Sequence, residues 1–353
     1  MADWLARFAK QSLIGVDIGS TGIKLLELSR RGEAFQLLSF VKVSYPYEQM
    51  LDPHLPDEAV VVATLQEALE KLNSKNRQAA VAINSATVIS RPFDAPAELT
   101  EQGLELYVRQ QADQLIPYSL EEVQLDYAPT GPVNEREETR PMMLVAARRD
   151  QVDMQVRLLT EAGLDCRLVD VDTYAIGRSL NYSLKKQRAT LDGLIGLLDI
   201  GAIRSVLYVY EGERLVYSRE HDFGDHQLSQ PPNTSTFDFE LEVDEDEQDS
   251  FQHQQQEYSY ANVLAQQTER ALILFQEAQP DSQLSMLVLA GGGGCREGLA
   301  EPLSKQLNVE VRHADPLAGI QIPAKLEKLI RPHAAALMTA AGLAMRAGRE
   351  WGS

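Results

Sequence analysis

Two short turns, about 180 residues apart, carry the residues of this sequence that are best suited to chemistry. Each follows a short apolar run and begins with Asp-Ile-Gly. Glycine lets backbone N–H groups approach a phosphate, and a hydroxyl or an ammonium group can supplement them. A carboxylate at the end of a buried strand can hold a magnesium ion through water. The phosphate-binding candidates are Asp17, Gly19, Ser20, Thr21, Gly22, Lys24, Asp199, Gly201, Ala202 and Ser205, with Asp17 and Asp199 as candidate magnesium ligands through water.

A third glycine-containing turn follows the apolar run 286–290 and precedes a predicted helix near Arg296. Backbone without side chains can lie against a ribose or a base. The run does not have the setting of a dinucleotide-binding Gly-x-Gly-x-x-Gly motif. Each turn by itself is a weak signal, but the three together predict a nucleotide site. The glycines are Gly291, Gly292, Gly293 and Gly294.

An internal repeat positions these turns. The pattern of apolar residues predicts strand, strand, strand, helix and strand within residues 12–88, and the same order returns after residue 193. The expected elements are strands at 13–17, 23–28, 35–43, 79–83, 194–199, 205–210, 214–219 and 286–290, and helices at 57–72 and 260–276. Two equivalent α/β halves facing each other across a cleft are a nucleotide-binding arrangement. The length of 353 residues also suits two lobes.

The segments between and around the halves complete the expected domain organisation. Residues 89–165 predict a small α+β subdomain inserted into the first lobe, with helices at 98–115 and 150–162 and strands at 123–127 and 142–146. The remaining boundaries are 1–11 for an N-terminal segment, 12–88 for the first lobe core, 166–192 for a connection between lobes, 193–223 and 260–330 for the second lobe, and 331–353 for a C-terminal helix returning to the first lobe.

The charge is unevenly distributed. The net charge is -19, and residues 220–269 contain no Lys or Arg, which argues against nonspecific binding of nucleic acid. Residues 224–259 are acidic and rich in glutamine, so we expect a disordered insert there, with a short docked strand at 237–243 as the alternative. No apolar run is long enough to span a bilayer, and residues 1–10 predict at most a short amphipathic helix. Cys166 and Cys295 match no metal-ligand spacing and suit a reducing compartment.

At this point the sequence resembles a family. The three turns resemble the phosphate-one, phosphate-two and adenosine motifs of the actin, Hsp70 and sugar-kinase superfamily. Within it, residues 14–28 (IGVDIGSTGIKLLEL) and 116–127 (IPYSLEEVQLDY) resemble the PilM family of type IV pilus assembly proteins, relatives of the cell-division protein FtsA. Residues 169–172 and 340–346 resemble the family's two connections between lobes. The resemblance covers about residues 12–223 and 260–347.

The resemblance implies a fold, a cofactor and a partner. The fold would be an actin-like (duplicated RNase H-like) two-lobed α/β ATPase fold with an FtsA-like inserted α+β subdomain. The chain would bind ATP and magnesium with at most slow hydrolysis. It would be cytoplasmic and peripheral at the inner membrane, where it binds the N-terminal peptide of a PilN-like membrane protein between the first lobe core and the inserted subdomain. Contacts with other pilus assembly proteins and self-association are also implied.

Three other functions remain open. A sugar kinase needs a carboxylate to activate a hydroxyl, and Asp170 and Asp172 have suitable positions, but no flanking sugar site is evident. An FtsA-like filament former usually carries a C-terminal membrane helix, and a type II secretion protein normally continues into a transmembrane helix. For hydrolysis, Asp172 is the catalytic candidate, either orienting water or only capping a helix at 173–180. Arg204 is expected to face solvent rather than a phosphate.

Overall fold

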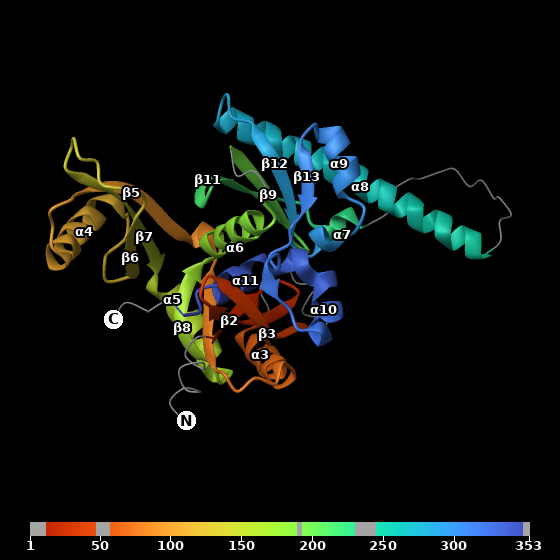
Figure 1. Cartoon of the computed structure of the whole chain (residues 1–353), viewed down its shortest axis with the longest axis horizontal. Helices are drawn as coiled ribbons and strands as arrows, with labels where there is room; N and C mark the ends of the chain where they lie inside the picture. Colours follow the sequence, from red (N-terminus) through yellow and green to blue (C-terminus); the bar gives the residue numbers. More distant parts are fainter. Residues whose placement is uncertain (1–11, 47–56, 189–192, 230–244, 349–353) are drawn as a thin grey trace.

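The computed structural model describes residues 12–46, 57–188, 193–229 and 245–348. It contains two α/β lobes, one above the other in Figure 1, and a smaller subdomain to one side. Among the described residues, three separate sheets form the framework of these three parts. The expected two-lobed actin-like architecture with an additional α+β subdomain is confirmed.

The first lobe contains a six-stranded sheet, and the turn that starts at Asp17 joins two of its strands, β1 and β2. β1 pairs antiparallel with β2 and parallel with β4. The buried apolar positions of β1 to β4 alternate between the two faces of the sheet, as expected for strands covered on both sides. The spatial order is β14 (Ile320–Gln321), β3 (Ala34–Ser44), β2 (Gly22–Arg31), β1 (Ser12–Ile18), β4 (Gln78–Ile83) and β8 (Asp165–Val171).

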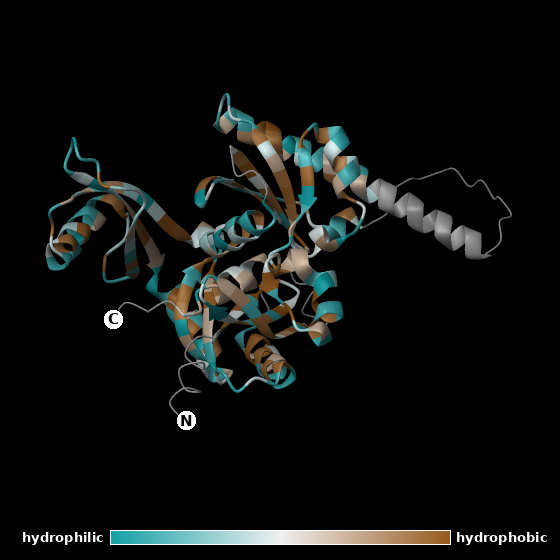
Figure 2. Cartoon of the chain, in the orientation of Figure 1, coloured by the Kyte–Doolittle hydropathy of each residue, from teal (hydrophilic) through white to brown (hydrophobic). Residues whose placement is uncertain are grey.

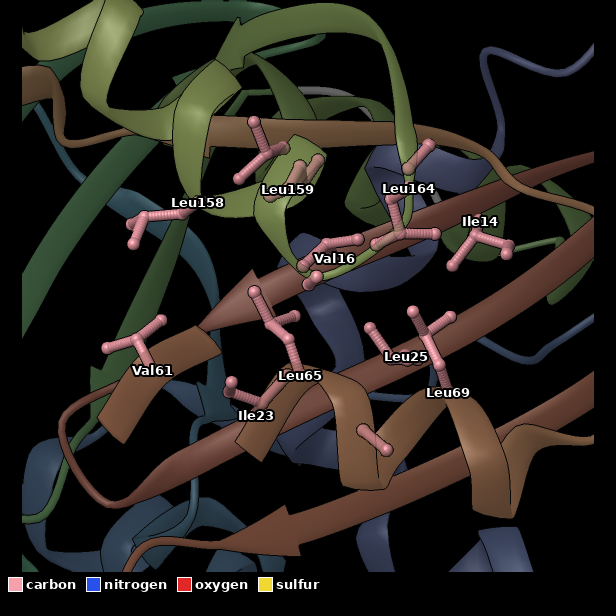
Figure 3. Close-up of a cluster of buried hydrophobic side chains, with 14 of the residues drawn as sticks. Ile14, Val16, Ile23, Leu25, Val61, Leu65, Leu69, Leu158, Leu159 and Leu164 are labelled. Atoms are coloured by element: carbon pink, nitrogen blue, oxygen red, sulfur yellow. The ribbon is translucent and has the colours of Figure 1, made fainter. Parts of the chain in front are cut away.

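Two helices, α3 (Glu58–Leu72) and α5 (Arg149–Glu161), cover one face of this sheet. Figure 3 shows their leucines and valines meeting the apolar side chains of β1 and β2. The opposite face packs against α10 (Ala324–Ile330), η3 (Arg331–Leu337) and α11 (Met338–Ala344). The first face is a closed core, whereas the second face points toward the other lobe.

The second lobe repeats the same plan. Its sheet has the order β11 (Arg214–His221), β10 (Ser205–Glu211), β9 (Leu194–Ile200), β12 (Leu284–Ala290) and β13 (Glu310–His313). β9 pairs antiparallel with β10 and parallel with β12, as β1 does with β2 and β4. The helices are α7 (Asp225–Leu228), α8 (Glu245–Ala278) and α9 (Ala300–Leu307). The expected internal repeat is therefore present in three dimensions.

Two crossing helices join the lobes. The apolar side chains of α6 (Asp172–Lys186) pack against the second sheet, and its other side crosses α11. The helices approach closely because a Cβ at Gly342 would lie 1.8 Å from the carbonyl oxygen of Ala175. Ser179 Oγ also donates to the carbonyl of Met338 at 2.8 Å. Gly342 thus permits the close approach of α6 and α11, which join the two lobes.

The smaller subdomain consists of a three-stranded sheet covered on one face by α4 (Glu101–Leu115). The strand order is β5 (Val88–Pro96), β7 (Thr139–Arg148) and β6 (Val123–Pro129). Figure 2 shows apolar strands and one apolar side of α4, with hydrophilic residues outside. Its core is small, with Val108, Ala112, Leu144 and Ala146 buried between helix and sheet.

Several expected boundaries need correction. The inserted unit was expected over residues 89–165, but Leu158 and Leu159 of α5 are buried in the first lobe core (Figure 3), and β8 is a strand of the first sheet. The separate unit is therefore 88–148. β14 pairs with β3, so residues 320–330 belong with the first lobe rather than the second. β5 and β8 were not predicted as strands because both are short of continuous apolar residues.

The insert expected at residues 224–259 also differs. α7 lies within it, Leu228 is buried in the second lobe core, and the chain is ordered through Ser229. α8 begins at Glu245, fifteen residues before the expected helix at 260. The expectation of disorder is therefore wrong at 224–229. Residues 230–244, including the possible strand at 237–243, and the N-terminal segment 1–11 lie outside the described residues.

Candidate functional site

The first candidate turn is a tight hairpin between β1 and β2. The backbone N–H of Gly19 donates to the carbonyl of Gly22 at 3.0 Å, which closes the turn. Gly22 has a φ of +155°, and a Cβ there would lie 2.3 Å from the carbonyl oxygen of Val43. The N–H groups of Ser20 and Thr21 form no backbone hydrogen bond within the described part of the chain. These two donors are available to an anion.

An ion pair borders this hairpin. Asp17 and Lys24 are directly opposite each other on β1 and β2, and Lys24 Nζ donates to Asp17 Oδ2 at 2.7 Å. Burial lowers the pKa of Lys24, but the charges of Asp17 and Asp199 outweigh it and raise the pKa overall. Lys24 therefore remains a cation. The hairpin presents one carboxylate, one ammonium group and two free backbone donors.

The second turn is closed by an equivalent backbone hydrogen bond. The N–H of Gly201 donates to the carbonyl of Arg204 at 3.0 Å, and the N–H groups of Ala202 and Ile203 form no backbone hydrogen bond among the described residues. The carbonyls of Gly201 and Ala202 accept hydrogen bonds from the first two N–H groups of α7 at 2.8 and 3.0 Å. α7 thus supports the second hairpin from behind.

Asp199 is the second carboxylate of the site. Its electrostatic neighbours include Lys24, Asp17 and Asp172, all from the first lobe side or the connection between lobes. Burial, opposed by Lys24 and reinforced by the two other carboxylates, raises the pKa of Asp199 to about 6. The structure therefore brings both predicted magnesium ligands into one electrostatic site, at a cost for the charged form of Asp199.

The glycine-rich turn packs directly on this carboxylate. Gly291 has a φ of +82°, and a Cβ there would lie 2.3 Å from Asp199 Oδ1. Its N–H donates to the carbonyl of Ala335 at 2.9 Å. A Cβ at Gly293 would lie 2.4 Å from Ile200, whereas a Cβ at Gly292 would meet nothing within 4 Å. The carbonyl of Gly294 lies 2.8 Å from His313 Nδ1. The glycines at 291 and 293 thus permit close packing, and Gly292 leaves open space.

The turn is held to α7 by a polar cluster that the sequence did not predict. Arg296 Nε donates to Asp225 Oδ1 at 2.9 Å, and the hydroxyl of Tyr260 donates to the same oxygen at 3.0 Å. The Arg296 guanidinium also lies over the Tyr260 ring, 4.4 Å from its centroid. No motif in the sequence announces this contact, because the three residues come from separate elements.

Asp172, the catalytic candidate, is the first residue of α6. Its Oδ1 accepts hydrogen bonds from the N–H groups of Ser85 at 3.0 Å and Thr173 at 2.6 Å. Burial raises the pKa of Asp172 against these hydrogen bonds. Asp170, the other carboxylate considered for a kinase, is buried and pairs with Arg178 at 3.0 Å. Asp170 is therefore not free to act as a base.

One predicted contact differs in the structure. The hydroxyl of Ser205 is buried and donates to the carbonyl of Phe223 at 2.8 Å, so it supports the hairpin instead of facing a ligand. This corrects its assignment to nucleotide binding. Arg204 Nη1 donates to Glu220 Oε1 at 2.7 Å on the surface, in agreement with the expectation that it faces solvent. The other predicted residues lie at the two hairpins and the glycine turn.

A separate cavity of about 290 Å³ lies on the small subdomain, between α4 and β6. β6 is an edge strand, and no strand pairs with its outer side within the described ranges. The lining mixes apolar side chains with a few charged ones, Glu105, Arg109 and Arg149 among them. Leu106 and Tyr118 are exposed nearby in the same subdomain. These features are typical of a site for an extended peptide.

Two properties of the described residues bear on membrane and metal binding. None of the helices there has both the length and the apolar character needed to cross a membrane. No three His, Cys, Asp or Glu side chains among them gather closely enough to hold a metal ion by themselves. A metal ion at Asp17 and Asp199 would therefore need ligands from water and from a bound phosphate group.

Several solved structures are similar to this chain, and the first of them supports the fold. A PilM-PilN type IV pilus biogenesis complex matches with a TM-score of 0.70 and 24% identity over 96% of this chain and 99% of that one. The ethanolamine utilization protein EutJ from Carboxydothermus hydrogenoformans matches with a TM-score of 0.49 and 17% identity, covering 95% and 89%. A protein with actin-like ATPase fold from Bacteroides thetaiotaomicron matches with a TM-score of 0.41 and 12% identity, covering 94% and 98%.

The sequence family is also identified. The model of the family described as type IV pilus assembly protein PilM matches residues 15–348, which include both hairpins, the small subdomain and the glycine-rich turn. The expected resemblance is therefore confirmed over nearly the whole chain. This chain belongs to the PilM family of type IV pilus assembly proteins.

Proposed function

We propose that this chain binds ATP with magnesium between its two Asp-Ile-Gly hairpins and, as part of a type IV pilus assembly platform, holds the N-terminal peptide of a PilN-like inner-membrane protein. The pair of equivalent hairpins is the observation that supports ATP binding. Each leaves two backbone N–H groups without a partner in the described structure, beside Asp17 and Asp199 respectively. Backbone donors of this kind form anion-binding concavities.

The residues present fit a magnesium nucleotide. Magnesium is usually held by one or two carboxylates and completed by water and substrate phosphates, so two aspartates suffice. When bound, the ion neutralises phosphate charge between the lobes. The bare backbone at Gly292, where a Cβ would meet nothing within 4 Å, leaves space for the nucleoside. Asp17 and Asp199 are the proposed ligands through water, and Lys24 supplies the nearest cation.

We expect hydrolysis to be slow. Asp172 is a third carboxylate, whose charge acts on Asp199, and its Oδ1 already accepts hydrogen bonds from the Ser85 and Thr173 N–H groups. Such a carboxylate is well fixed but has one oxygen left to orient water. Asp170 is paired with Arg178, which removes one of the two carboxylates considered as the base of a kinase. The bound nucleotide then acts mainly to set how the lobes are held together.

The proposed peptide site lies on the small subdomain. A peptide adding to the free edge of β6 would gain main-chain hydrogen bonds, and alternate side chains would enter the cavity beside α4. The solved PilM-PilN complex is similar in fold to this chain and makes such a partner reasonable. A partner anchored in the inner membrane would hold this chain at the cytoplasmic surface of that membrane.

Calorimetry with the purified chain tests both halves. We expect ATP to bind in the presence of magnesium and a PilN-like N-terminal peptide to bind independently of the first hairpin. Arg109→Glu, in the lining of the cavity, should weaken peptide binding by about tenfold. An acidic group of the peptide would lose its partner there or be repelled by the new carboxylate. Arg91→Glu, on the exposed opposite edge of the sheet, is the matched control. No binding of ATP to the folded protein would refute the nucleotide proposal, and equal effects of the two variants would refute the peptide site.

A further inference from the structure

A row of three charged residues crosses the first sheet beside the proposed nucleotide site. Asp17 on β1 is directly opposite Lys24 on β2, and Lys24 is directly opposite Lys42 on β3. Residues directly opposite each other in neighbouring strands share a face of the sheet, with Cβ atoms about 5 Å apart. The three side chains therefore start from one line across the sheet.

The line lies on the face that points toward the second lobe. Val41 and Val43, on either side of Lys42, pack into the core under α3. Lys42 therefore leaves the opposite face, as does Phe40 two residues earlier. The Phe40 ring lies 6.1 Å from the His333 ring of η3, measured between centroids. Burial, and then the charges of Lys42 and Lys24, lower the pKa of His333.

The glycine-rich turn of the second lobe faces the same two lysines. Burial raises the pKa of Cys295, and the charges of Lys42 and Lys24 act against that change. Cys295 follows directly after the four glycines. Lys42 therefore lies opposite a residue of the first hairpin, and its charge acts on a residue of η3 and on the residue that follows the glycine turn. These three segments surround the proposed nucleotide site.

The charges in this row do not balance. Lys24 is neutralised by Asp17 at 2.7 Å, but Lys42 forms no ion pair with a carboxylate in the part of the chain that the structure describes. Two cations directly opposite each other in a sheet are unfavourable unless an anion lies against both. The phosphate chain of a nucleotide held at residues 17–24 is such an anion.

We propose that Lys42 is a second phosphate-binding cation, which contacts the phosphate chain beside Lys24 and favours a polyphosphate over a nucleoside without phosphate. This inference rests on the proposed nucleotide function and adds a residue to it. An ammonium group can turn to follow a phosphate, and because Lys42 is exposed, screening by water keeps its contribution modest. The chemical class of ligand is a nucleoside di- or triphosphate.

Titrations of Lys42→Gln and Lys75→Gln with ATP and with adenosine test the inference. Lys75 is an exposed lysine beyond the end of α3, next to Asn76, which bonds to Ser12 at the opposite end of β1 from the hairpin. Both variants lose one positive charge. Lys42→Gln should weaken ATP binding by about tenfold and leave adenosine binding unchanged. Lys75→Gln should change neither.

Thermal unfolding of the nucleotide-free protein gives a second readout. Because the like-charged pair is removed, Lys42→Gln should melt at the same temperature as the unchanged protein or higher, yet gain less stability from ATP. Equal ATP affinities of the two variants, or an equal loss of adenosine affinity in Lys42→Gln, would overturn the role of Lys42. If the unchanged protein binds no nucleotide, the proposed function fails, and tripolyphosphate becomes the probe. A weaker response of Lys42→Gln to it would support the cation site, and an identical response would overturn it.

Discussion

The two Asp-Ile-Gly hairpins are closed by the same backbone hydrogen bond and have different electrostatics. Both are closed by a 3.0 Å hydrogen bond from a glycine N–H to the carbonyl three residues later. On the next strand, however, Asp17 is opposite Lys24, whereas Asp199 is opposite Val206. Lys24 Nζ pairs with Asp17 Oδ2 at 2.7 Å, whereas burial raises the pKa of Asp199 to about 6. Duplication of a fold therefore preserved the turn, while one cross-strand neighbour gave the two aspartates different properties.

The largest expected effect on ATP binding is at Asp17, the carboxylate that pairs with Lys24. Asp17→Ala removes one of two magnesium ligands and leaves Lys24 without its partner. We expect magnesium-dependent ATP affinity to fall by about a thousandfold, or about 4 kcal/mol. Calorimetry with and without a chelator measures the change, and Asp94→Ala on the exposed part of β5 is the control. Unchanged affinity in a folded Asp17→Ala protein would rule out this site.

Removing the charge of the half-buried Asp199 should stabilise the protein when no ligand is present, whereas removing the charge of Asp17 should not. The folded state binds a proton at Asp199 more tightly than the unfolded chain, so stability falls as the pH rises from about 4 to 6, and the cost is complete above that range. The pKa rise from 3.8 to about 6 corresponds to up to about 3 kcal/mol. Asp199→Asn should therefore stabilise the nucleotide-free protein at pH 7.5 and have little effect below pH 4.

Chemical denaturation at several pH values measures this difference. Asp17→Asn is the informative counterpart, because it leaves the half-buried ammonium of Lys24 unpaired and should destabilise the protein at pH 7.5 by about 2 kcal/mol. Opposite signs for the two variants would support the comparison. If both destabilise the protein equally at all pH values, the two aspartates do not differ as the structure indicates.

The glycine-rich turn at residues 291–294 tests the environment of Asp199 in the second lobe. A Cβ at Gly291 would lie 2.3 Å from Asp199 Oδ1, and its φ of +82° is strained for alanine. Gly291→Ala should cost about 2 kcal/mol in stability and weaken ATP binding by displacing Asp199. Gly292→Ala, with open space around its Cβ, is the matched control and should keep stability within about 0.5 kcal/mol. Similar destabilisation by both variants would show that the close contact with Asp199 is unimportant.

The smallest effect is expected at Arg204. Its guanidinium pairs with Glu220 on the surface, and such pairs contribute about 0 to 1 kcal/mol. Arg204→Ala should leave ATP affinity within about twofold, because the cation of the first hairpin has no phosphate-binding equivalent in the second. A loss of tenfold or more in the same titration would mean that Arg204 leaves Glu220 to bind phosphate.

Much of the framework could be predicted from local pattern. Apolar runs ending in glycine located β1, β9 and β12, and the repeated order of elements located both hairpins. Failures occurred where a residue's role depends on distant contacts. The apolar side of α5 is visible in the sequence, but only packing shows that Leu158 and Leu159 join the first lobe. The acidic composition at 224–259 concealed α7, because Leu228 is the only apolar anchor within it.

By itself, the sequence determined the strands that border the two turns, the turns and their glycines, since these depend on hydrophobic periodicity and on backbone conformations that only nearby residues affect. The tertiary structure decided what the polar side chains do. In the folded chain the Ser205 hydroxyl is buried and donates to the Phe223 carbonyl, and Asp172 accepts a hydrogen bond from the Ser85 N–H. Strand pairing places Lys42 opposite Lys24. Strand register and lobe packing bring these groups together from distant positions, and the free energy of a charge depends on its neighbours and its burial rather than on its place in the chain.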